Sequence, residues 1–255
     1  MSGNRFSSFV ASIPPVTKNL IIINLIIWVA EALFPRFASF IVHHLGLHYV
    51  PATEFNPVQL ITYLFIHAES TPLHVLFNMF TLLMFGVILE RVWGSKRFFI
   101  FYFVCGVGAA LVQELVWSLT WMNDYIGILA RQNGLTADTV REIVHRELAA
   151  GDPELLSAMS MMKNSLVTIG ASGAVFGVIM GFAMVFPDRP MYVMFIPIPI
   201  KAKYLMIFYG VLEFFLGVAE IDMVAHFAHL GGMLFGLVLL LYWKKKGTLY
   251  SGGFY

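Results

Sequence analysis

Charged residues are scarce in this chain. Only 12% of its 255 residues are Asp, Glu, Lys or Arg, whereas 59% are hydrophobic. A soluble domain is about half apolar and about a quarter charged, so this composition is typical of a polytopic membrane protein. The single cysteine, Cys105, excludes an intrachain disulfide and a metal cluster built from cysteines. The sequence also has no internal repeat, no low-complexity stretch and no basic patch of the kind that binds nucleic acid, so no nucleic-acid partner is expected.

Six apolar segments are long enough to cross a bilayer, which takes about 20 mostly apolar residues, within a range of about 17 to 25. The predicted spans are residues 19–36, 73–90, 98–117, 166–186, 203–219 and 223–243. The first, third and fifth contain Glu31, Glu114 and Glu213, and we expect these carboxylates to face the helix bundle rather than lipid. The expected fold is an all-α integral membrane bundle of six transmembrane helices over residues 19–243, between an N-terminal segment 1–18 and a tail 244–255.

The distribution of Lys and Arg predicts the orientation of the bundle, because cytoplasmic loops carry an excess of basic residues. With the N-terminus in the cytoplasm, 11 of the 16 basic residues fall in cytoplasmic segments and 5 in outer segments. The outer set is Arg36, Arg131, Arg141, Arg146 and Lys163. The opposite topology would place the larger set outside, so both termini are expected in the cytoplasm.

Residues 118–165 are predicted to form a helical insertion in the third outer loop. One helix is indicated by an apolar stripe at helical spacing, Val140, Ile143, Val144 and Leu148. Thr139 with Glu142 fits a capping box for this helix, and Asp152 followed by Pro153 fits the start of another. A subdomain lying on the bilayer surface is favoured here over a role in substrate binding.

Three polar side chains are predicted at one depth in the membrane. Asn78, Ser172 and His229 lie about five or six residues inside spans that begin at the outer face, which is roughly 8–9 Å at about 1.5 Å per residue. His74 is one turn nearer the outside, on the same helical face as Asn78. Hydroxyl, imidazole and carboxamide at one level are what a serine hydrolase needs, because serine requires a base and the oxyanion requires donors.

Glycines surround two of these residues and predict close contact between the fourth and sixth spans. They are Gly170, Gly173, Gly177 and Gly181 in the fourth span, and Gly232 and Gly236 in the sixth. Each glycine motif alone is ordinary helix packing, but together with the shared depth they favour a Ser172–His229 pair. Gly232 and Gly236 follow His229 by three and seven residues and share its face, so the base is predicted to be His229. His226 is interpreted as a polar residue nearer the outer headgroups, without a role in chemistry.

These motifs resemble those of the rhomboid family of intramembrane proteases. Gly170-Ala171-Ser172-Gly173 resembles its G-x-S-G motif, Ala228-His229 with Gly232 and Gly236 its A-H-x-x-G-x-x-x-G motif, and His74 to Asn78 its H-x-x-x-N motif. The segment from Glu90 to Arg97 is similar to its short cytoplasmic turn, and Pro197 to Lys203 to its entry into the fifth helix. The resemblance covers residues 60–243 and leaves the insertion 118–165 outside.

The resemblance implies a serine endopeptidase whose nucleophile is Ser172 and whose base is His229, without a third acid. It implies an oxyanion hole formed by the Ser172 backbone N–H, His74 and Asn78, with Gly170, Gly173, Gly232 and Gly236 as supporting residues. Phe176 stands where the family often has a tyrosine stacked on the catalytic histidine. Neither a cofactor nor a metal is implied. The expected substrates are single-span transmembrane proteins, cut near the outer face of a bacterial inner (plasma) membrane whose lipid surrounds the protease domain.

The sequence leaves three alternatives open. A non-catalytic rhomboid-like binding module would recognise transmembrane partners, although such relatives typically lack the serine or the histidine. A transporter would use Glu31, Glu114 and Glu213 as a relay, but no inverted repeat supports it. A metalloprotease is disfavoured because H-E-x-x-H is absent and His226-x-x-His229 lacks a third ligand on the same span.

Overall fold

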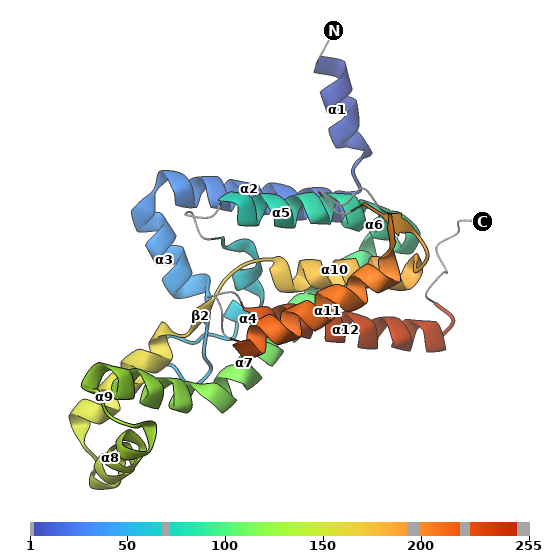
Figure 1. Cartoon of the computed structure of the whole chain (residues 1–255). Coiled ribbons are helices and arrows are strands. Elements are labelled where there is room, and N and C mark those ends of the chain that lie inside the picture. The colour runs from blue at the N-terminus through green and yellow to red at the C-terminus, as the bar shows by residue number, and fades with distance from the viewer. Residues whose placement is uncertain (1–2, 68–71, 193–198, 220–224, 249–255) are drawn as a thin grey trace.

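The computed structural model describes residues 3–67, 72–192, 199–219 and 225–248. In this part of the chain the fold is almost entirely helical (Figure 1). The N-terminal half contains α1 (Gly3–Ser12), α2 (Pro15–Leu33), α3 (Pro35–Leu45), α4 (Gln59–Thr62), the 3-10 turn η1 (Tyr63–Phe65), α5 (Pro72–Thr81), the π-helical η2 (Leu82–Gly86) and α6 (Val87–Trp93). The remainder contains α7 (Ser95–Asn133), α8 (Ala137–Ala150), α9 (Pro153–Ser165), α10 (Ser172–Val185), α11 (Ala202–Ala219) and α12 (His226–Lys245).

Two short antiparallel ladders link the helices. In one, β1 (Leu47–His48) pairs with β2 (Val167–Thr168), and in the other β3 (Pro190–Met191) pairs with β4 (Ile200–Lys201). The first ladder joins the segment after α3 to the segment before α10, although the two are more than a hundred residues apart in sequence. Both Pro197 and the tail residues 249–255 lie outside the described residues.

Five helical segments of the described chain are long and apolar enough to cross a membrane. They are α2, the continuous stretch Pro72–Trp93, α7, α11 and α12. The remaining predicted span, the fourth (166–186), corresponds to α10, which is apolar but has only 14 residues and begins at Ser172 instead of residue 166. The all-α membrane fold is therefore confirmed, whereas the count of six complete spans is not.

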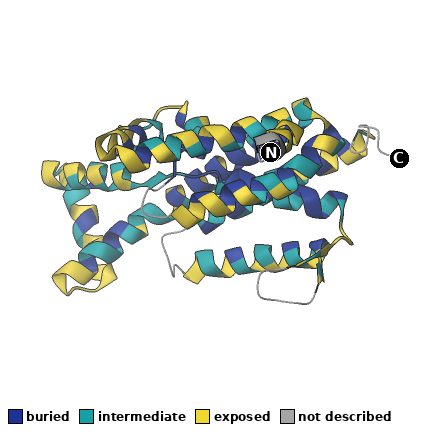
Figure 2. Cartoon of the chain, turned by 90° about the horizontal axis from the view of Figure 1, so that it is seen from above, coloured by how far each residue is buried: buried dark blue, intermediate teal, exposed yellow. Residues whose placement is uncertain are grey.

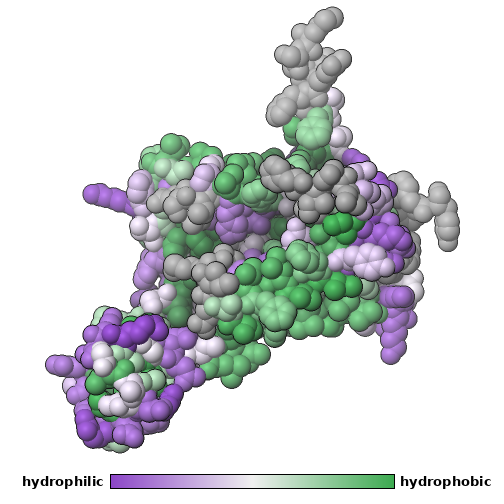
Figure 3. Space-filling model, in the orientation of Figure 1, coloured by the Kyte–Doolittle hydropathy of each residue, from purple (hydrophilic) through white to green (hydrophobic). Residues whose placement is uncertain are grey.

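The helix α10 lies at the centre of the bundle. It packs against α12, α7 and α11 and also contacts α5 and α6, and the buried residues accordingly gather in the middle of the molecule (Figure 2). By contrast, α11 has few buried residues, and its exposed side chains form an apolar surface (Figure 3). Such a surface is suited to contact with lipid, because soluble proteins rarely expose large contiguous apolar patches to water.

The predicted carboxylates in the spans are buried, as expected, and each has a partner. Glu31 accepts a hydrogen bond from the backbone N–H of His67 at 3.3 Å, and Glu114 accepts one from that of Val50 at 2.8 Å. These two contacts tie residues 37–67, the described part of the predicted first outer loop, to α2 and α7. Glu213 contacts α12 instead, as described below.

The turn between α6 and α7 is tight, as the resemblance implied. Gly94 has φ +78°, which a residue with a side chain rarely adopts, and α7 begins at the next residue. The carboxylate of Glu90 accepts hydrogen bonds from the backbone N–H groups of Val16 and Thr17 and from the Ser95 hydroxyl. A negative group thus satisfies free N–H groups where α2 begins, which stabilises that end of the helix.

The insertion differs from its predicted form because α7 does not stop at residue 117. It continues to Asn133, so the first part of the insertion extends a membrane helix. Its outer end packs on α8 through a small core of Ile126, Ala130, Val140 and Val144. The surface over α8 and α9 is largely hydrophilic (Figure 3), in keeping with a position outside the hydrocarbon region.

The two predicted helix starts in the insertion have different outcomes. Asp152 caps α9 as expected, because its side chain accepts a hydrogen bond from the backbone N–H of Leu155 at 2.7 Å. The capping box at Thr139 and Glu142 is wrong, because α8 begins one turn earlier. Thr136 is its N-cap and accepts from the backbone N–H of Thr139.

Candidate active site

Ser172 is the first residue of α10, at the end of an extended segment held by the first outer loop. The backbone N–H of Gly170 donates to the carbonyl of Tyr63 at 2.9 Å, and Gly170 has φ +121°. This conformation favours glycine and turns the chain into the helix. Ser172 is therefore not one and a half turns inside a helix, as the depth count assumed. It lies at a helix N-terminus, where backbone N–H groups have no intrahelical partner.

His229 lies in the first turn of α12 and points at Ser172. Its Nε2 is 2.8 Å from Ser172 Oγ, and the residue is 6% exposed. The ring of Phe176, one turn along α10 from Ser172, stacks on the imidazole with centroids 4.3 Å apart and an angle of 9° between the planes. The structure thus brings Ser172, His229 and Phe176 together.

Glycines permit this approach of α10 and α12. A Cβ added to Gly232 would lie 1.8 Å from the carbonyl oxygen of Gly173, and one added to Gly173 would lie 2.4 Å from the Cβ of Ala109 on α7. Gly236 is less tightly enclosed, with Sγ of Cys105 at 3.1 Å from its added Cβ. The short separation of Ser172 and His229 therefore depends most directly on glycine at 173 and 232.

His74 and Asn78 lie on α5, beside the segment that precedes Ser172. A Cβ added to Gly170 would lie 3.5 Å from Cε1 of His74 and 3.9 Å from Ser172 Oγ. Asn78 is buried, and its Nδ2 is 3.4 Å from Nε2 of His67. Side chains from α5 and the start of α10 therefore converge on one region.

His67, which the sequence analysis did not single out, lies between Asn78 and the turn before Ser172. Its Nε2 accepts from the backbone N–H of Ala171 at 3.5 Å, so the ring of the neutral imidazole carries its proton on Nδ1. Burial, together with nearby His74, lowers the pKa of His67 to about 4. The ring is therefore neutral at physiological pH, and Asn78 can donate one Nδ2 hydrogen to it and keep the other for a ligand.

Glu213 on α11 completes the surroundings of His229. Its Oε2 is 2.8 Å from Nδ1 of His229 and 2.7 Å from Nδ1 of His226, and all three residues are buried. His226, which the sequence places one turn nearer the outer headgroups than His229, is 6% exposed and bonded to Glu213, so it belongs to the buried surroundings of His229. A buried carboxylate on one span and two histidines on the next were the sequence signal for this contact.

These three residues are also of types that bind metal ions. One oxygen of Glu213 and one nitrogen from each of His226 and His229 lie within 4.8 Å of one another. The third ligand, which is absent from the span that carries His226 and His229, is thus available from Glu213 on α11. Among the described residues, this cluster could hold a metal.

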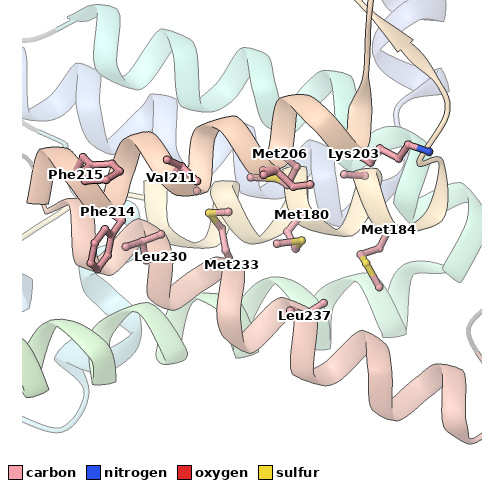
Figure 4. A pocket seen from close by; sticks show the side chains of 13 residues that line it. Met180, Met184, Lys203, Met206, Val211, Phe214, Phe215, Leu230, Met233 and Leu237 are labelled. Carbon is pink, nitrogen blue, oxygen red and sulfur yellow. The ribbon is translucent and has the colours of Figure 1, made fainter.

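An apolar cavity of about 620 Å³ lies between α10, α11 and α12 (Figure 4), and two of its lining residues are sequence neighbours of His229 and Glu213. Leu230, next to His229, and Phe214, next to Glu213, line one end, and Lys203 lies near the other. Methionines from all three helices line its middle, Met180, Met206 and Met233. Flexible side chains of this kind adapt to ligands of different shape.

The arrangement defines a helical, multi-pass membrane protein with a serine and a histidine in hydrogen-bond contact between two closely packed helices. A family model described as the rhomboid domain matches residues 54–137 and 148–246, which is most of the chain. The protein therefore belongs to the rhomboid family, a family of intramembrane proteases that also includes inactive members. No curated protein matches the chain. Most of the insertion 118–165 lies inside the family match, so the expectation that the resemblance leaves it out is wrong.

Proposed function

We propose that this protein is an intramembrane serine endopeptidase that cleaves transmembrane proteins near their outer ends. The observation that carries the proposal is the 2.8 Å contact between His229 Nε2 and Ser172 Oγ in a partly buried setting. A serine hydroxyl is a weak nucleophile until an adjacent base accepts its proton, and this contact supplies the base.

In the proposed reaction Ser172 Oγ attacks a substrate carbonyl while His229 accepts the hydroxyl proton on Nε2. The oxyanion is held by the Ser172 backbone N–H at the start of α10 and by the side chains of His74 and Asn78. His229 then gives the proton to the leaving amine, and water hydrolyses the acyl-enzyme. The stacked ring of Phe176 keeps the imidazole plane fixed during both transfers.

Single-span proteins are the proposed substrates. Their helices must partly unwind before cleavage, because an intact helix engages its peptide groups in hydrogen bonds. The cavity between α10, α11 and α12 supports this proposal, since an apolar, methionine-lined space accepts the side chains of an unwound membrane segment.

A cleavage assay in liposomes tests the proposal. The purified protein is mixed with a panel of single-span substrates, and the products are mapped by mass spectrometry. The parent is expected to cut at least one substrate near its outer membrane boundary, and Ser172→Ala is expected to cut none. Equal cleavage by both proteins, or a parent that neither cleaves nor reacts with a fluorophosphonate probe, contradicts the proposal and favours the non-catalytic binding module.

We also propose that both termini face the cytoplasm of a bacterium and that α8 and α9 lie outside its inner membrane. In intact cells, Thr139→Cys on the exposed face of α8 is expected to react with a membrane-impermeant maleimide, whereas Lys245→Cys at the end of α12 reacts only after permeabilisation. The parent is the control, because Cys105 is 0% exposed. The opposite labelling pattern contradicts the proposed orientation.

A further inference from the structure

The placement of Glu213 is not explained by a two-residue catalytic centre. It is one of three buried residues on α11, with Ala202 and Met206, and the other two are apolar. A carboxylate removed from water is costly unless it is hydrogen-bonded, and among the described residues Glu213 bonds to two histidines of α12. One of those histidines is the residue that contacts Ser172.

The hydrogen bond to Glu213 determines which nitrogen of His229 carries the proton. An ionised carboxylate only accepts, so Nδ1 of His229 must donate, and the neutral ring then has its lone pair on Nε2. That lone pair faces Ser172 Oγ at 2.8 Å. The tautomer selected by Glu213 is therefore the one that can accept the serine proton.

A second donor holds the carboxylate itself. His226 Nδ1 donates to the same oxygen, Oε2, at 2.7 Å, and the two imidazole planes are perpendicular. Because His226 and His229 lie on one helix, three residues apart, their ring positions are fixed relative to each other. The oxygen that contacts His229 is thus held from two directions.

We propose that Glu213 is a positioning residue that orients His229, so that the centre works as a Ser172–His229–Glu213 triad. This inference rests on the proposed protease function. During attack the proton of Ser172 Oγ moves to His229 Nε2, and the proton on Nδ1 stays hydrogen-bonded to Glu213, which remains ionised throughout. The negative carboxylate stabilises the imidazolium formed in this step.

Metal binding by the same three residues is incompatible with this role. A metal on Nδ1 of His229 would occupy the lone pair there and leave the ring proton on Nε2, which faces the serine. His229 could then not accept the proton of Ser172. A metal at this cluster would inhibit the protease, so chelators distinguish the two uses.

The experiment compares Glu213→Gln with the parent in liposomes. The amide keeps the shape of the side chain but removes its charge. We expect kcat and the rate of fluorophosphonate labelling of Ser172 to fall at least about 10-fold, in the direction seen when the triad carboxylate of serine proteases becomes an amide, while KM changes less than about 3-fold. Glu213→Asp, which keeps the charge, is expected to be more active than Glu213→Gln.

Two further variants serve as controls. Glu114→Gln also neutralises a buried carboxylate in a span, but one bonded to Val50 of the outer loop, and it is expected to keep kcat within about 2-fold. His226→Ala leaves the bond between Glu213 and His229 available and is expected to lose less than about 10-fold. A chelator is expected to leave the activity of the parent unchanged.

The results separate this inference from the proposed function. A parent that neither cleaves nor labels overturns both. An active parent together with Glu213→Gln at parental rates overturns only the role of Glu213. If Glu213→Gln has lower thermal stability and a higher KM but an unchanged labelling rate, Glu213 only stabilises the packing of α11 on α12. If activity requires a metal, the cluster is a metal site. Either result overturns the positioning role.

Discussion

Replacing His229 by alanine is expected to lower kcat at least about 10³-fold. Serine proteases lose that much or more when the histidine that acts as the general base is removed. His226 is not expected to take its place. His226 Nδ1 is engaged by Glu213, and its ring centroid is 6.2 Å from that of His229. Cleavage of the substrate panel and fluorophosphonate labelling of Ser172 should fall together, since both need an activated hydroxyl.

His226→Ala is the matched comparison, because it removes an imidazole of the same size from the same helix. It is expected to keep more than about a tenth of the parental turnover, since His229 and Ser172 remain in contact. Both variants are compared at equal expression and with thermal unfolding in detergent as the check of folding. A folded His226→Ala that is inactive beside an active His229→Ala would mean that the base has been assigned to the wrong histidine.

Replacing Gly232 by valine is expected to unfold the bundle or force α10 and α12 apart. The added Cβ would lie 1.8 Å from the carbonyl oxygen of Gly173, and a backbone atom cannot turn aside as a side chain can. Contact at an ordinary distance of about 3.4 Å requires the helices to separate by roughly 1.5 Å, beyond the usual overpacking cost of about 1–3 kcal/mol. That movement alone breaks the hydrogen bond between Ser172 and His229.

Thermal unfolding in detergent and labelling of Ser172 measure the two consequences. Gly127→Ala on α7 is the control, because its added Cβ would meet only the guanidinium of Arg131 at 3.6 Å. This variant should be as stable as the parent or slightly more stable, since alanine is the better helix former. A Gly232→Val protein that melts with the parent and labels at the parental rate would refute the close-packed crossing.

Much of the helix bundle can be predicted from the length of the apolar segments and the spacing of the glycines, which are local properties of the sequence. The positions of Ser172, His229 and Gly232 on two helices that must meet could be predicted because each motif lies within one or two helical turns. The start of α10 could not. Residues 166–171 are apolar enough for a membrane helix, yet they precede α10 as a non-helical segment because β1 and the carbonyl of Tyr63 provide hydrogen-bond partners for it.

The contacts of Glu213 and His67 were missed for a related reason. Each depends on a contact between separate elements. Glu213 on α11 contacts α12, the next helix along the chain, whereas His67 contacts the turn before α10, about a hundred residues away. A polar residue in an apolar run indicates that a partner exists, but nothing in the run says which one. Glu31 and Glu114 gave the same signal and contact the outer loop instead.

The helix α7 is long enough to connect the α8–α9 region with the centre of the bundle. Its 39 residues span about 58 Å at about 1.5 Å per residue, against a hydrocarbon core of about 30 Å, so one unbroken rod runs from the α8–α9 region into the centre of the bundle. No proline interrupts it. At its inner part, Gly108 lies against Phe235 of α12 and Ala109 against Gly173 of α10. A protein or lipid surface that binds α8 and α9 therefore also restrains one end of α7, the helix against which α10 with Ser172 and α12 with His229 pack.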